Sequence, residues 1–535
     1  MIAPSPEPDI VRNLLRPDAY GAGGTRRVSL RTTHASWVFL TDAEAWKVKR
    51  PVDFGFLDFR TLEARRRACE DEVRLNRRLA PGIYLGVEPV RAAAGGHTLA
   101  GAGDGAIVDW AVHMRRLPDG ASAEALLRLG LLTPERLAAL ARRVAVFLDQ
   151  AAPTPALGTP DVLRRNVDEN FAQVEPFVGD LVDRATFEDV RAFQLGALAS
   201  HHPRFVARIE DGRVRDGHGD LRLEHVYFLP APDGIVAVDC IEFNDRFRCG
   251  DAAGEAAFLA MELEAARRPD LAAGFLARFA EESDDFGLYG VVDFYLSYRA
   301  WVRGKVAAFL ASDTTEDAPL RVRKQDEARR QFALARSFSG APVDAPFVIV
   351  VGGIVGSGKS TLASALGHEL AAPVVSSDRT RKATAGLAAT ERGGAALYTN
   401  AAIARNYGNV LERAQRVLES GRGVILDATF LERRWREAAA ALARAARARF
   451  VYVEASADRA VLRARLAARR SQASVSDATD AELDAIARRQ EPFAAGEAGP
   501  HVPIDTGGAA SAALEAALRA LNAAGVDRAA ARRAS

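Results

Sequence analysis

The residues best suited to chemistry form a glycine-rich stretch in the last third of the chain. Residues 353–360 read GIVGSGKS and match the spacing G-x-x-x-x-G-K-[ST] at every fixed position. Glycine backbones can curl until their N–H groups converge on phosphate oxygens. We therefore predict a phosphate-binding loop made by Gly353, Gly356, Ser357, Gly358, Lys359, Ser360 and Thr361. Within it, Lys359 would bring mobile positive charge to the reacting phosphates and Ser360 would bind Mg²⁺.

Two carboxylates follow short apolar runs in the same region. Asp378 comes after the run 374–375 and Asp427 after the run 424–426. In open α/β sheets, ligands collect at the carboxyl ends of the strands. Asp378 can take a proton from an attacking hydroxyl, with helix N-capping as the alternative role. Asp427 can orient the magnesium shell or the acceptor. The cations beside Asp378 would suit an anionic acceptor: Arg379, Arg381 and Lys382.

A further group of cations lies on or near one predicted helix after the apolar run 450–453. Its members are Arg463, Arg465, Arg469 and Arg470. A mobile lid at this place would bring guanidinium charge onto the transferring phosphoryl group. A solvated helix face explains most of these residues equally well. We predict nucleotide contacts for Arg465 and Arg469.

A second set of chemically competent residues lies in the first half of the chain. Residues 218–220 read HGD, and a turn followed by the apolar strand 235–238 separates Asp220 from Asp239. Two carboxylates in this arrangement suit phosphoryl transfer. Asp220 would accept the proton of the acceptor, and Asp239 would bind Mg²⁺ on a triphosphate.

Two lysines extend this second set. Lys47 and Lys49 lie on one face of the strand-like segment 45–49, and a helical stretch that contains Glu70 and Glu72 follows. A strand lysine paired with a helix glutamate grips the α- and β-phosphates of ATP in kinase-like folds. We therefore expect Lys47, Lys49 and Glu72 to bind nucleotide.

The elements that must position these residues differ between the two parts of the chain. Uninterrupted apolar runs, which are typical of strands covered on both faces, recur in the C-terminal part at 347–351, 374–375, 424–426, 450–453 and 502–504. They predict a parallel α/β sheet. The N-terminal part begins with strand-like pieces and continues with long helical patterns, which predicts a small sheet-containing lobe followed by a helical one. Strand-like pieces occur at 37–40, 45–48 and 106–114.

Composition limits the partners and the surroundings of the protein. The chain has 535 residues, with 71 basic and 70 acidic side chains. This balance gives no global field that would attract nucleic acid, so such a partner is not expected. Three cysteines without a CxxC pair suit a reducing, cytoplasmic setting. No leader pattern and no apolar run long enough to span a bilayer is visible in the sequence.

The C-terminal motifs resemble those of small P-loop kinases. The phosphate loop, the stretch 376–382 and the segment 426–429 are similar to those of gluconate-kinase-like, polynucleotide-kinase-like and zeta-toxin-like enzymes, over roughly residues 346–523. In those families the carboxylate that matches Asp378 commonly activates the acceptor hydroxyl. The resemblance therefore implies that Asp378, rather than Asp427, is the base.

The N-terminal motifs resemble the aminoglycoside-phosphotransferase-like branch of the protein-kinase fold, over roughly residues 30–338. The resemblance implies that Asp220 is the catalytic aspartate, that Asp239 binds metal, and that residues 112–118 form the hinge between lobes. It also puts His225 at the position of a metal-binding asparagine, although imidazole is a poorer ligand for Mg²⁺ than a carbonyl oxygen. The order of the two parts is similar to that of a set of bacterial two-domain ATP-binding proteins.

These observations predict a mixed α/β and α+β protein. We expect a bilobal protein-kinase-like domain over residues 1–336, with its small lobe ending near 115, a linker at 337–345, and a P-loop NTPase domain over 346–535. The predicted activity is transfer of the γ-phosphate from ATP with Mg²⁺ to a hydroxyl of a small molecule or nucleotide. The N-terminal domain would be a second phosphotransferase or a regulator. The alternatives are a nucleotide-gated sensor with a pseudokinase domain and a nucleic-acid end kinase.

Overall fold

A computed structural model describes most of the chain. The described residues are 8–21, 26–33, 35–53, 55, 57–93, 95–99, 105–314, 317–340, 345–388, 391–469, 483, 488–494, 496–497 and 499–526. Backbone contacts divide the chain into two compact units. The first comprises Met1–Thr133, Gln150–Gly158 and Val214–Glu255, and the second comprises Pro134–Asp149, Thr159–Arg213 and Ala256–Ser535. The expected linker at 337–345 falls inside the second unit, and the expected domain boundary stays a prediction.

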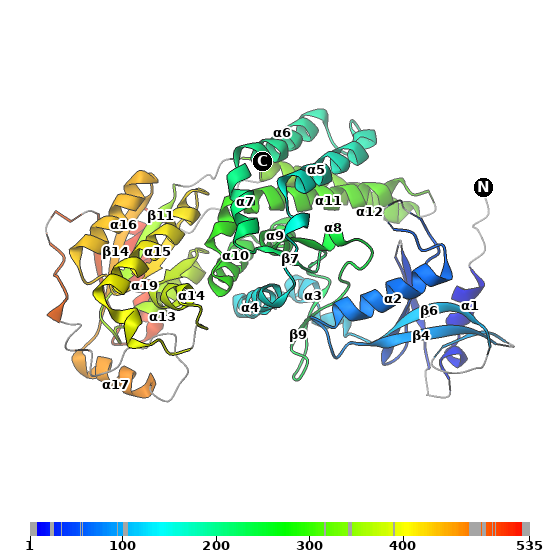
Figure 1. The fold of residues 1–535 in the computed structure, drawn as a ribbon, viewed down its shortest axis with the longest axis horizontal. Helices are drawn as coiled ribbons and strands as arrows, with labels where there is room; N and C mark the ends of the chain where they lie inside the picture. The colour runs from blue at the N-terminus through cyan, green and yellow to red at the C-terminus, as the bar shows by residue number, and fades with distance from the viewer. Residues whose placement is uncertain are drawn as a thin grey trace. The chain divides into compact units, whose positions relative to one another are not determined.

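The first unit is built on a six-stranded antiparallel sheet (Figure 1). In order across the sheet, its strands are β1 (Ser29–Thr32), β2 (Ser36–Leu40), β3 (Glu44–Lys49), β6 (Ile107–Arg115), β4 (Tyr84–Ala93) and β5 (Gly96–Thr98). Helix α2 (Leu62–Asn76) packs on β4 and β6, and buries Cys69 and Val73 against Tyr84 and Val112. The strands expected at 37–40, 45–48 and 106–114 are confirmed.

Short elements complete the first unit. They are α1 (Asp9–Leu14), α3 (Ala123–Arg128), α8 (Asp245–Arg248), and the strand pairs β7 (Val214–Asp216) with β10 (Cys249–Asp251) and β8 (Val226–Phe228) with β9 (Ile235–Ala237). The β8–β9 pair is antiparallel, and its turn separates Asp220 from Asp239, as the sequence predicts.

The second unit contains a set of long helices. These are α4 (Pro134–Gln150), α5 (Pro160–Val174), α6 (Arg184–Ser200), α7 (His202–Glu210), α9 (Ala252–Ala265), α10 (Pro269–Ser283), α11 (Val292–Ser312) and α12 (Ala318–Ser337). The buried Trp301 of α11 lies at their centre, with its ring centroid 4.4 Å from that of Phe171 and 4.7 Å from that of Phe332. Several helices begin after a residue whose side chain accepts a hydrogen bond from a backbone N–H of the first turn. In α6, the carboxylate of Asp183 accepts from the N–H of Thr186.

The same unit contains a five-stranded parallel sheet. Across it the strands are β12 (Val374–Ser376), β13 (Val424–Asp427), β11 (Phe347–Gly352), β14 (Arg449–Ser456) and β15 (His501–Asp505). All five expected strands are therefore confirmed. The helices of this part are α13 (Lys359–Glu369), α14 (Ser377–Thr384), α15 (Asn400–Leu418), α16 (Arg433–Ala445), α17 (Arg459–Arg469) and α19 (Ala510–Ala523).

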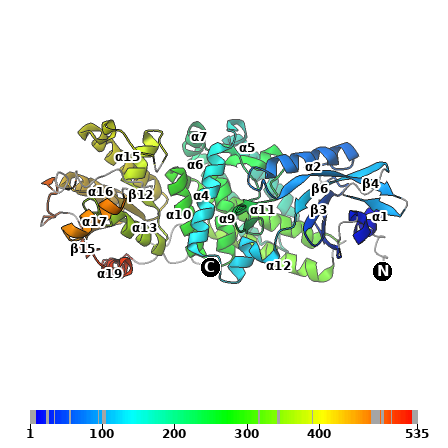
Figure 2. The ribbon, with the colours of Figure 1, turned by 90° about the horizontal axis from the view of Figure 1, so that it is seen from below.

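Helices cover both faces of the parallel sheet. Figure 2 shows α15 and α16 on one side of it and α13 and α19 on the other. Leu362 and Leu366 of α13 and Leu521 of α19 bury their side chains against Ile349 and Val453 of the sheet. All six residues of β11 are buried, which explains why this strand is apolar throughout. Among the described residues, no helix is both long and apolar enough to cross a lipid bilayer.

Candidate phosphate and acceptor site

The loop between β11 and α13 is shaped by close backbone contacts. Gly353 has a φ of +141°, and a Cβ at this position would lie 2.3 Å from the carbonyl oxygen of Ala455. Its N–H donates to the carbonyl of Thr429 at 3.0 Å. A side chain would therefore be excluded at Gly353 by both strain and space, so the loop depends on glycine here.

The loop presents polar groups that have no hydrogen-bond partner among the described residues. The side chain of Ser357 is fully buried, and its Oγ makes no hydrogen bond within the described part of the chain. Gly358, with a φ of +80°, ends the loop and begins α13. The helix then presents its first-turn N–H groups and the hydroxyls of Ser360 and Thr361, both of which are exposed. A helix N-terminus with free donors is a ready anion site, so the residues present fit a bound phosphate chain.

The carboxylate of Asp427 lies next to the start of α13. Ser360 donates to Asp427 at 3.1 Å, from Oγ to Oδ1. Burial raises the pKa of Asp427 above its usual value. The nearby Lys359 ammonium works against this rise, and the carboxylate of Asp378 adds to it. Hydroxyl and carboxylate oxygens are the ligands that Mg²⁺ takes from a protein when phosphates and water complete its shell. The pair Ser360 and Asp427 therefore fits Mg²⁺, and Lys359, Asp378 and Asp427 form one electrostatic cluster.

Asp378 lies in the first turn of α14, where β12 ends. Of the three neighbouring cations, Arg381 contacts it directly, with Nη1 2.6 Å from Oδ1. The guanidinium of Arg381 also stacks over the ring of Tyr398 at 4.8 Å. Arg379 instead pairs with Glu282 at 3.2 Å, and Lys382 is buried with 1% of its surface exposed. Arg381 therefore contacts the carboxylate directly, and the expectation that these three cations bind an anionic acceptor stays a prediction.

Two buried polar atoms next to Asp378 lack partners within the described residues. They are Nε of Arg381 and Oδ1 of Asn406. The amide nitrogen of Asn406 donates to Oγ of Ser377 at 2.8 Å, and Arg381 donates to the same oxygen at 3.3 Å. One donor and one acceptor without partners, held on a common serine, form a polar lining next to the carboxylate. Unmet hydrogen-bonding groups of this kind are costly unless a ligand or water satisfies them.

Helix α17 brings one of the predicted arginines to the phosphate loop. Arg465 donates to the carbonyl oxygen of Gly356 at 3.3 Å and also to the carbonyl oxygen of Thr506. Thr506, which sequence reasoning missed, in turn donates its hydroxyl proton to the carbonyl of Ser357. Arg469 ends α17, but its side chain lies outside the described residues, as does all of Arg470. Thr506 lies far along the chain from the phosphate loop, so no local sequence pattern could reveal this contact.

The first unit holds a second cluster at β3 and α2. Lys47 contacts Glu72 at 2.9 Å and also pairs with Asp239. Lys49 pairs with Glu72 and with Glu242, and all three of these side chains are almost fully buried. The two lysines therefore do share one face of the strand, as expected. Burial opposes a charge on Lys49, but Glu242 and Glu72 outweigh it and keep the pKa of Lys49 above its usual value.

The loop before Asp220 is held by a residue that sequence reasoning missed. Backbone N–H groups of His218 and Gly219 donate to Oε1 of Glu255 at 3.0 and 2.6 Å. The ring nitrogens of His218 have no hydrogen-bond partner within the described residues. Burial lowers the pKa of His218 to about 3. Glu255, rather than the imidazole of His218, thus holds the loop in place. Glu255 lies near the start of a helix far along the chain, so no local sequence pattern indicates this role.

His225 lies between the two carboxylates of this cluster. Its Nδ1 is 2.9 Å from the carbonyl oxygen of Asp220, and its Nε2 is 3.6 Å from Oδ2 of Asp239. Asp239 has a φ of +66°, a conformation that strains a residue with a side chain. Burial would raise the pKa of Asp239, but Lys47 and His225 outweigh it and hold that pKa well below its usual range. The structure therefore brings Lys47, Asp220, His225 and Asp239 together.

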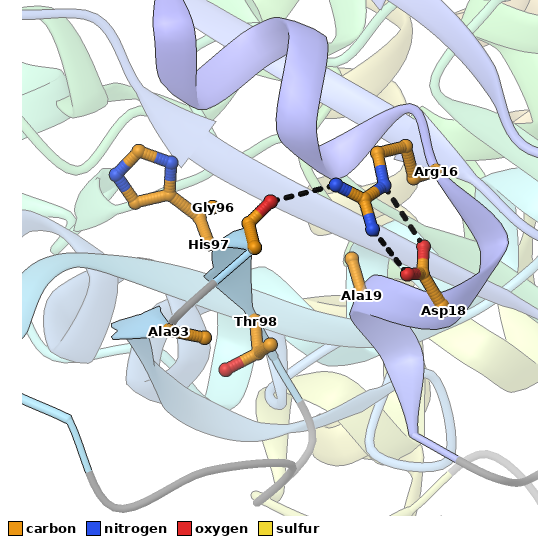
Figure 3. Close-up of a pocket in the computed structure, with 8 residues that line it drawn as sticks. Arg16, Asp18, Ala19, Ala93, Gly96, His97 and Thr98 are labelled. Atoms are coloured by element: carbon orange, nitrogen blue, oxygen red, sulfur yellow. Dashed lines mark hydrogen bonds and ion pairs between the residues drawn. The ribbon is translucent and has the colours of Figure 1, made fainter.

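A small surface pocket elsewhere in the first unit is formed around the short 3-10 helix η1 (Pro17–Tyr20) and β5. Figure 3 shows Arg16 paired with Asp18 and directed toward the strand that carries Gly96 and His97. Arg16 also donates to the carbonyl of Gly95 at 2.6 Å. Because its charge is already paired, this pocket offers no chemistry comparable to the two clusters described above.

Comparisons with known proteins identify relatives across nearly the whole chain. The uncharacterized protein Rv2004c of Mycobacterium tuberculosis strain H37Rv is 32% identical over 498 residues, which cover 92% of this chain and 95% of that protein. Protein Mb2027c of Mycobacterium bovis matches with the same values. The AAA domain family AAA_33 matches residues 348–493, the part that contains the phosphate loop, Asp378 and Asp427.

Solved structures match separate parts of the chain. A gluconokinase from Sinorhizobium meliloti is 22% identical, covers 33% of this chain and 93% of its own, and gives a TM-score of 0.26. A choline/ethanolamine kinase family protein from Mesorhizobium loti is 12% identical, covers 62% of this chain and 99% of its own, and gives a TM-score of 0.36. An ADP-bound aminoglycoside phosphotransferase is 10% identical, covers 61% and 97%, and gives a TM-score of 0.31.

Proposed function

Since this chain belongs to the same family as the mycobacterial protein Rv2004c, which it matches over 92% of its length, we propose that its C-terminal part is a kinase. It transfers the γ-phosphate of ATP to a hydroxyl of a small molecule or nucleotide. The observation that carries the proposal is the meeting of Ser360, Asp427 and Lys359 with Asp378 at the carboxyl ends of β12 and β13. These groups supply metal ligands, a phosphate-binding cation and a base within one site.

The roles follow from chemistry and place. The loop N–H groups and Lys359 bind the β- and γ-phosphates, while Ser360 and Asp427 hold Mg²⁺. When bound, Mg²⁺ neutralises charge on the transferring phosphoryl group. The acceptor oxygen forms a bond to the γ-phosphorus as the bond from that phosphorus to the β–γ bridging oxygen breaks. Asp378 takes the proton of the acceptor hydroxyl, and ADP leaves.

Arg381 supports this chemistry on the acceptor side. Its ion pair with Asp378 fixes the orientation of the carboxylate. Nε of Arg381 and Oδ1 of Asn406, which have no partner in the described part of the chain, offer one donor and one acceptor to a polar substrate. A polyhydroxylated or anionic acceptor matches this lining better than an apolar one.

The N-terminal cluster supports a second nucleotide site. Lys47 and Glu72 would grip the α- and β-phosphates, Asp239 and His225 would hold Mg²⁺, and Asp220 would act as base if this unit transfers phosphate. The proposal for this unit is a second phosphotransferase or a regulator. His225→Asn separates the two roles: a catalytic unit limited by its histidine ligand should gain Mg²⁺-dependent turnover, whereas a regulator should not.

The test uses the full chain, labelled ATP and a panel of acceptors that includes sugars, sugar acids, nucleosides and a 5′-hydroxyl oligonucleotide. Asp378→Asn should lower acceptor-dependent turnover by about 10²–10⁴-fold, the usual contribution of a general base. The matched control is Glu437→Gln, which removes an exposed carboxylate paired only with Arg433 on the same helix. Equal turnover in the wild type and Asp378→Asn would remove the proposed base.

A nucleotide-gated sensor is the competing function. It predicts that ATP binds without acceptor-dependent turnover and that Asp378→Asn changes nothing. Preferential labelling of the oligonucleotide would instead favour a nucleic-acid end kinase. Asp220→Asn, assayed in the same panel, reports whether any part of the turnover comes from the first unit.

A further inference from the structure

The strand that delivers Asp378 is short and lies at the edge of its sheet. β12 has three residues and pairs only with β13. The carbonyl of Pro373 accepts a hydrogen bond from Ile425 of β13. In a trans peptide the N–H points opposite to the C=O, so the N–H of Val374 must point away from the sheet. This donor is buried and needs a partner outside the sheet.

Helix α10 supplies that partner. The N–H of Val374 donates to Oε1 of Glu281 at 2.9 Å. Glu281 has 8% of its surface exposed, and its other oxygen pairs with Arg278 one turn earlier on the same helix. A buried carboxylate on a helix more than ninety residues upstream thus satisfies the edge of the strand. This contact lies within the second compact unit.

The residue after Asp378 is held by the same end of α10. Arg379 pairs with Glu282 at 3.2 Å and donates to the carbonyl of Glu281 at 3.3 Å. Glu282 also pairs with Arg142 of α4 at 3.2 Å, so its carboxylate is itself fixed from two sides. Asp378 is therefore flanked on its strand side by Val374 and on its helix side by Arg379, and α10 holds both.

Further ion pairs continue this contact along the chain. Asp284 makes two bonds to Arg413 of α15, at 2.8 and 2.6 Å. Asp293 of α11 pairs with Arg422, just before β13, at 2.7 Å. In each pair the carboxylate belongs to residues 281–293 and the guanidinium to the part that carries the phosphate loop. A further pair in this region, Arg204 with Glu419 at 3.0 Å, has the opposite direction of charge.

We propose that Glu281 and Glu282 are positioning residues of the C-terminal kinase, which hold Asp378 at the place where it meets the acceptor hydroxyl. This inference rests on the proposed function. The phosphate loop is anchored separately, through hydrogen bonds to Thr429 and Thr506, and does not touch α10 through these bonds. Loss of the α10 contacts should therefore impair the acceptor step and spare nucleotide binding.

The physical reason is that the sheet itself holds β12 only weakly. A three-residue edge strand with one neighbour is weakly held. An unsatisfied buried N–H would favour displacement of the strand toward water. A shift of about 1 Å in a catalytic group can lower turnover by about a hundredfold. Glutamate at 281 is needed here as a hydrogen-bond acceptor, whereas glutamate at 282 is needed as a charge.

That distinction gives a test with internal rescue. Glu281→Gln keeps a side-chain carbonyl that can accept from Val374, so its acceptor-dependent kcat should stay within about threefold of the wild type. Glu281→Met keeps the shape and loses the acceptor, so its kcat should fall by about tenfold or more. The KM for ATP should change less than about twofold in both variants. Glu188→Gln, an exposed carboxylate on α6 paired with Arg184, is the control.

The Glu282 contact is tested by a double-mutant cycle with Arg379. Glu282→Gln and Arg379→Gln should each lower kcat by about threefold to tenfold, and the double variant should be little worse than either, because both remove one shared contact. Multiplicative losses, or a matching rise in the KM for ATP, would overturn the positioning role.

Hydrogen exchange decides the same question without any turnover. Amides of residues 374–378 should exchange about tenfold faster in Glu281→Met than in the wild type, while Glu281→Gln stays protected and residues 353–358 are unchanged. Equal protection in all three proteins would overturn the inference. If no acceptor is phosphorylated by the wild type, the proposed function fails, and this exchange measurement still shows whether α10 holds the strand.

Discussion

Arg465 of α17 and Gly356 of the phosphate loop are joined directly, with Nη1 of the guanidinium 3.3 Å from the carbonyl oxygen. The same side chain reaches Thr506 after β15. Because two carbonyl oxygens hold this guanidinium beside the phosphate loop, we predict that it contributes positive charge to bound phosphates.

Replacement of this arginine should slow transfer more than it weakens binding. Arg465→Lys keeps one positive charge but loses the planar fork, so kcat should fall by about 10²-fold, somewhat less than the effect of a dedicated arginine finger. Arg463→Lys on the exposed side of the same helix should leave kcat within about twofold. Steady-state kinetics with saturating acceptor compare them. A similar fall in both variants would point to the helix as a whole rather than to Arg465.

The proposed Mg²⁺ site at Ser360 and Asp427 gives a second prediction. Ser360→Ala removes the hydroxyl that faces Asp427, so the Mg²⁺ concentration for half-maximal turnover should rise by about tenfold or more, because a ligand and its orientation are lost together. Ser364→Ala, one turn further along α13 and exposed, is the control. The measurement is a Mg²⁺ titration at fixed ATP. An unchanged midpoint in Ser360→Ala would contradict the assignment of Ser360 as a ligand.

The buried ion pair in the first unit gives a stability prediction. Lys49→Met leaves Glu242 buried without its cation, so the unit should lose about 3–5 kcal/mol of stability. Lys49→Met with Glu242→Met should regain most of that loss, because the buried carboxylate of Glu242 is gone and Glu72 keeps its contact with Lys47. The exposed pair of Arg67 and Glu63 serves as control, and Arg67→Met should cost less than about 1 kcal/mol.

Hydrogen exchange of β3 amides in rising urea measures this loss locally, since β3 carries Lys49. If the double variant is as unstable as Lys49→Met, packing of the lysine stem rather than its charge explains the effect.

The imidazole of His218 makes the first unit sensitive to acid. In the unfolded chain a histidine binds a proton below about pH 6.5, whereas burial keeps folded His218 neutral down to about pH 3. The unfolded state therefore binds more protons between these values, and folding stability falls as pH is lowered, by about 1.4 kcal/mol per pH unit from this group. His225, Asp220, Asp239 and Arg78 are the charged neighbours in this shift.

His218→Phe removes the titrating group. Its urea-unfolding free energy should fall less steeply than that of the wild type between pH 6 and pH 4.5, by about 1 kcal/mol per unit. Parallel curves for the two proteins would show that His218 takes up its proton in the folded state as readily as in the unfolded one.

The sequence predicted the parallel sheet well because its strands are covered on both faces. β11 is buried along its whole length, so no polar position interrupts it, and its end coincides with the phosphate loop. Lys47 and Lys49 were also placed on one face, because side chains alternate along a strand. Of the neighbouring glutamates, Glu72 is buried at the lysines whereas Glu70 is exposed and pairs with Arg66.

The contacts that the sequence did not reveal are those between distant segments. Glu255, Glu281 and Thr506 each act on a loop or strand at least 36 residues away, and none lies in a motif. The neighbouring residues in the sequence suggest that Arg379 binds the acceptor, but in the fold Arg379 pairs with Glu282. The direction in which each of these adjacent cations points depends on where the helix begins and on which distant residues pair with it. The local sequence determines neither.

The most direct test of the central claim is calorimetric titration of Mg·ATP into the full chain carrying Lys47→Ala and Asp239→Ala, which leaves the phosphate loop as the remaining proposed nucleotide site. The account predicts one bound nucleotide per chain, with an affinity that falls by at least about tenfold when Lys359→Ala is added, since a charge-assisted contact to phosphate is lost. Absence of binding in the first protein, or equal affinity with and without Lys359, would contradict it.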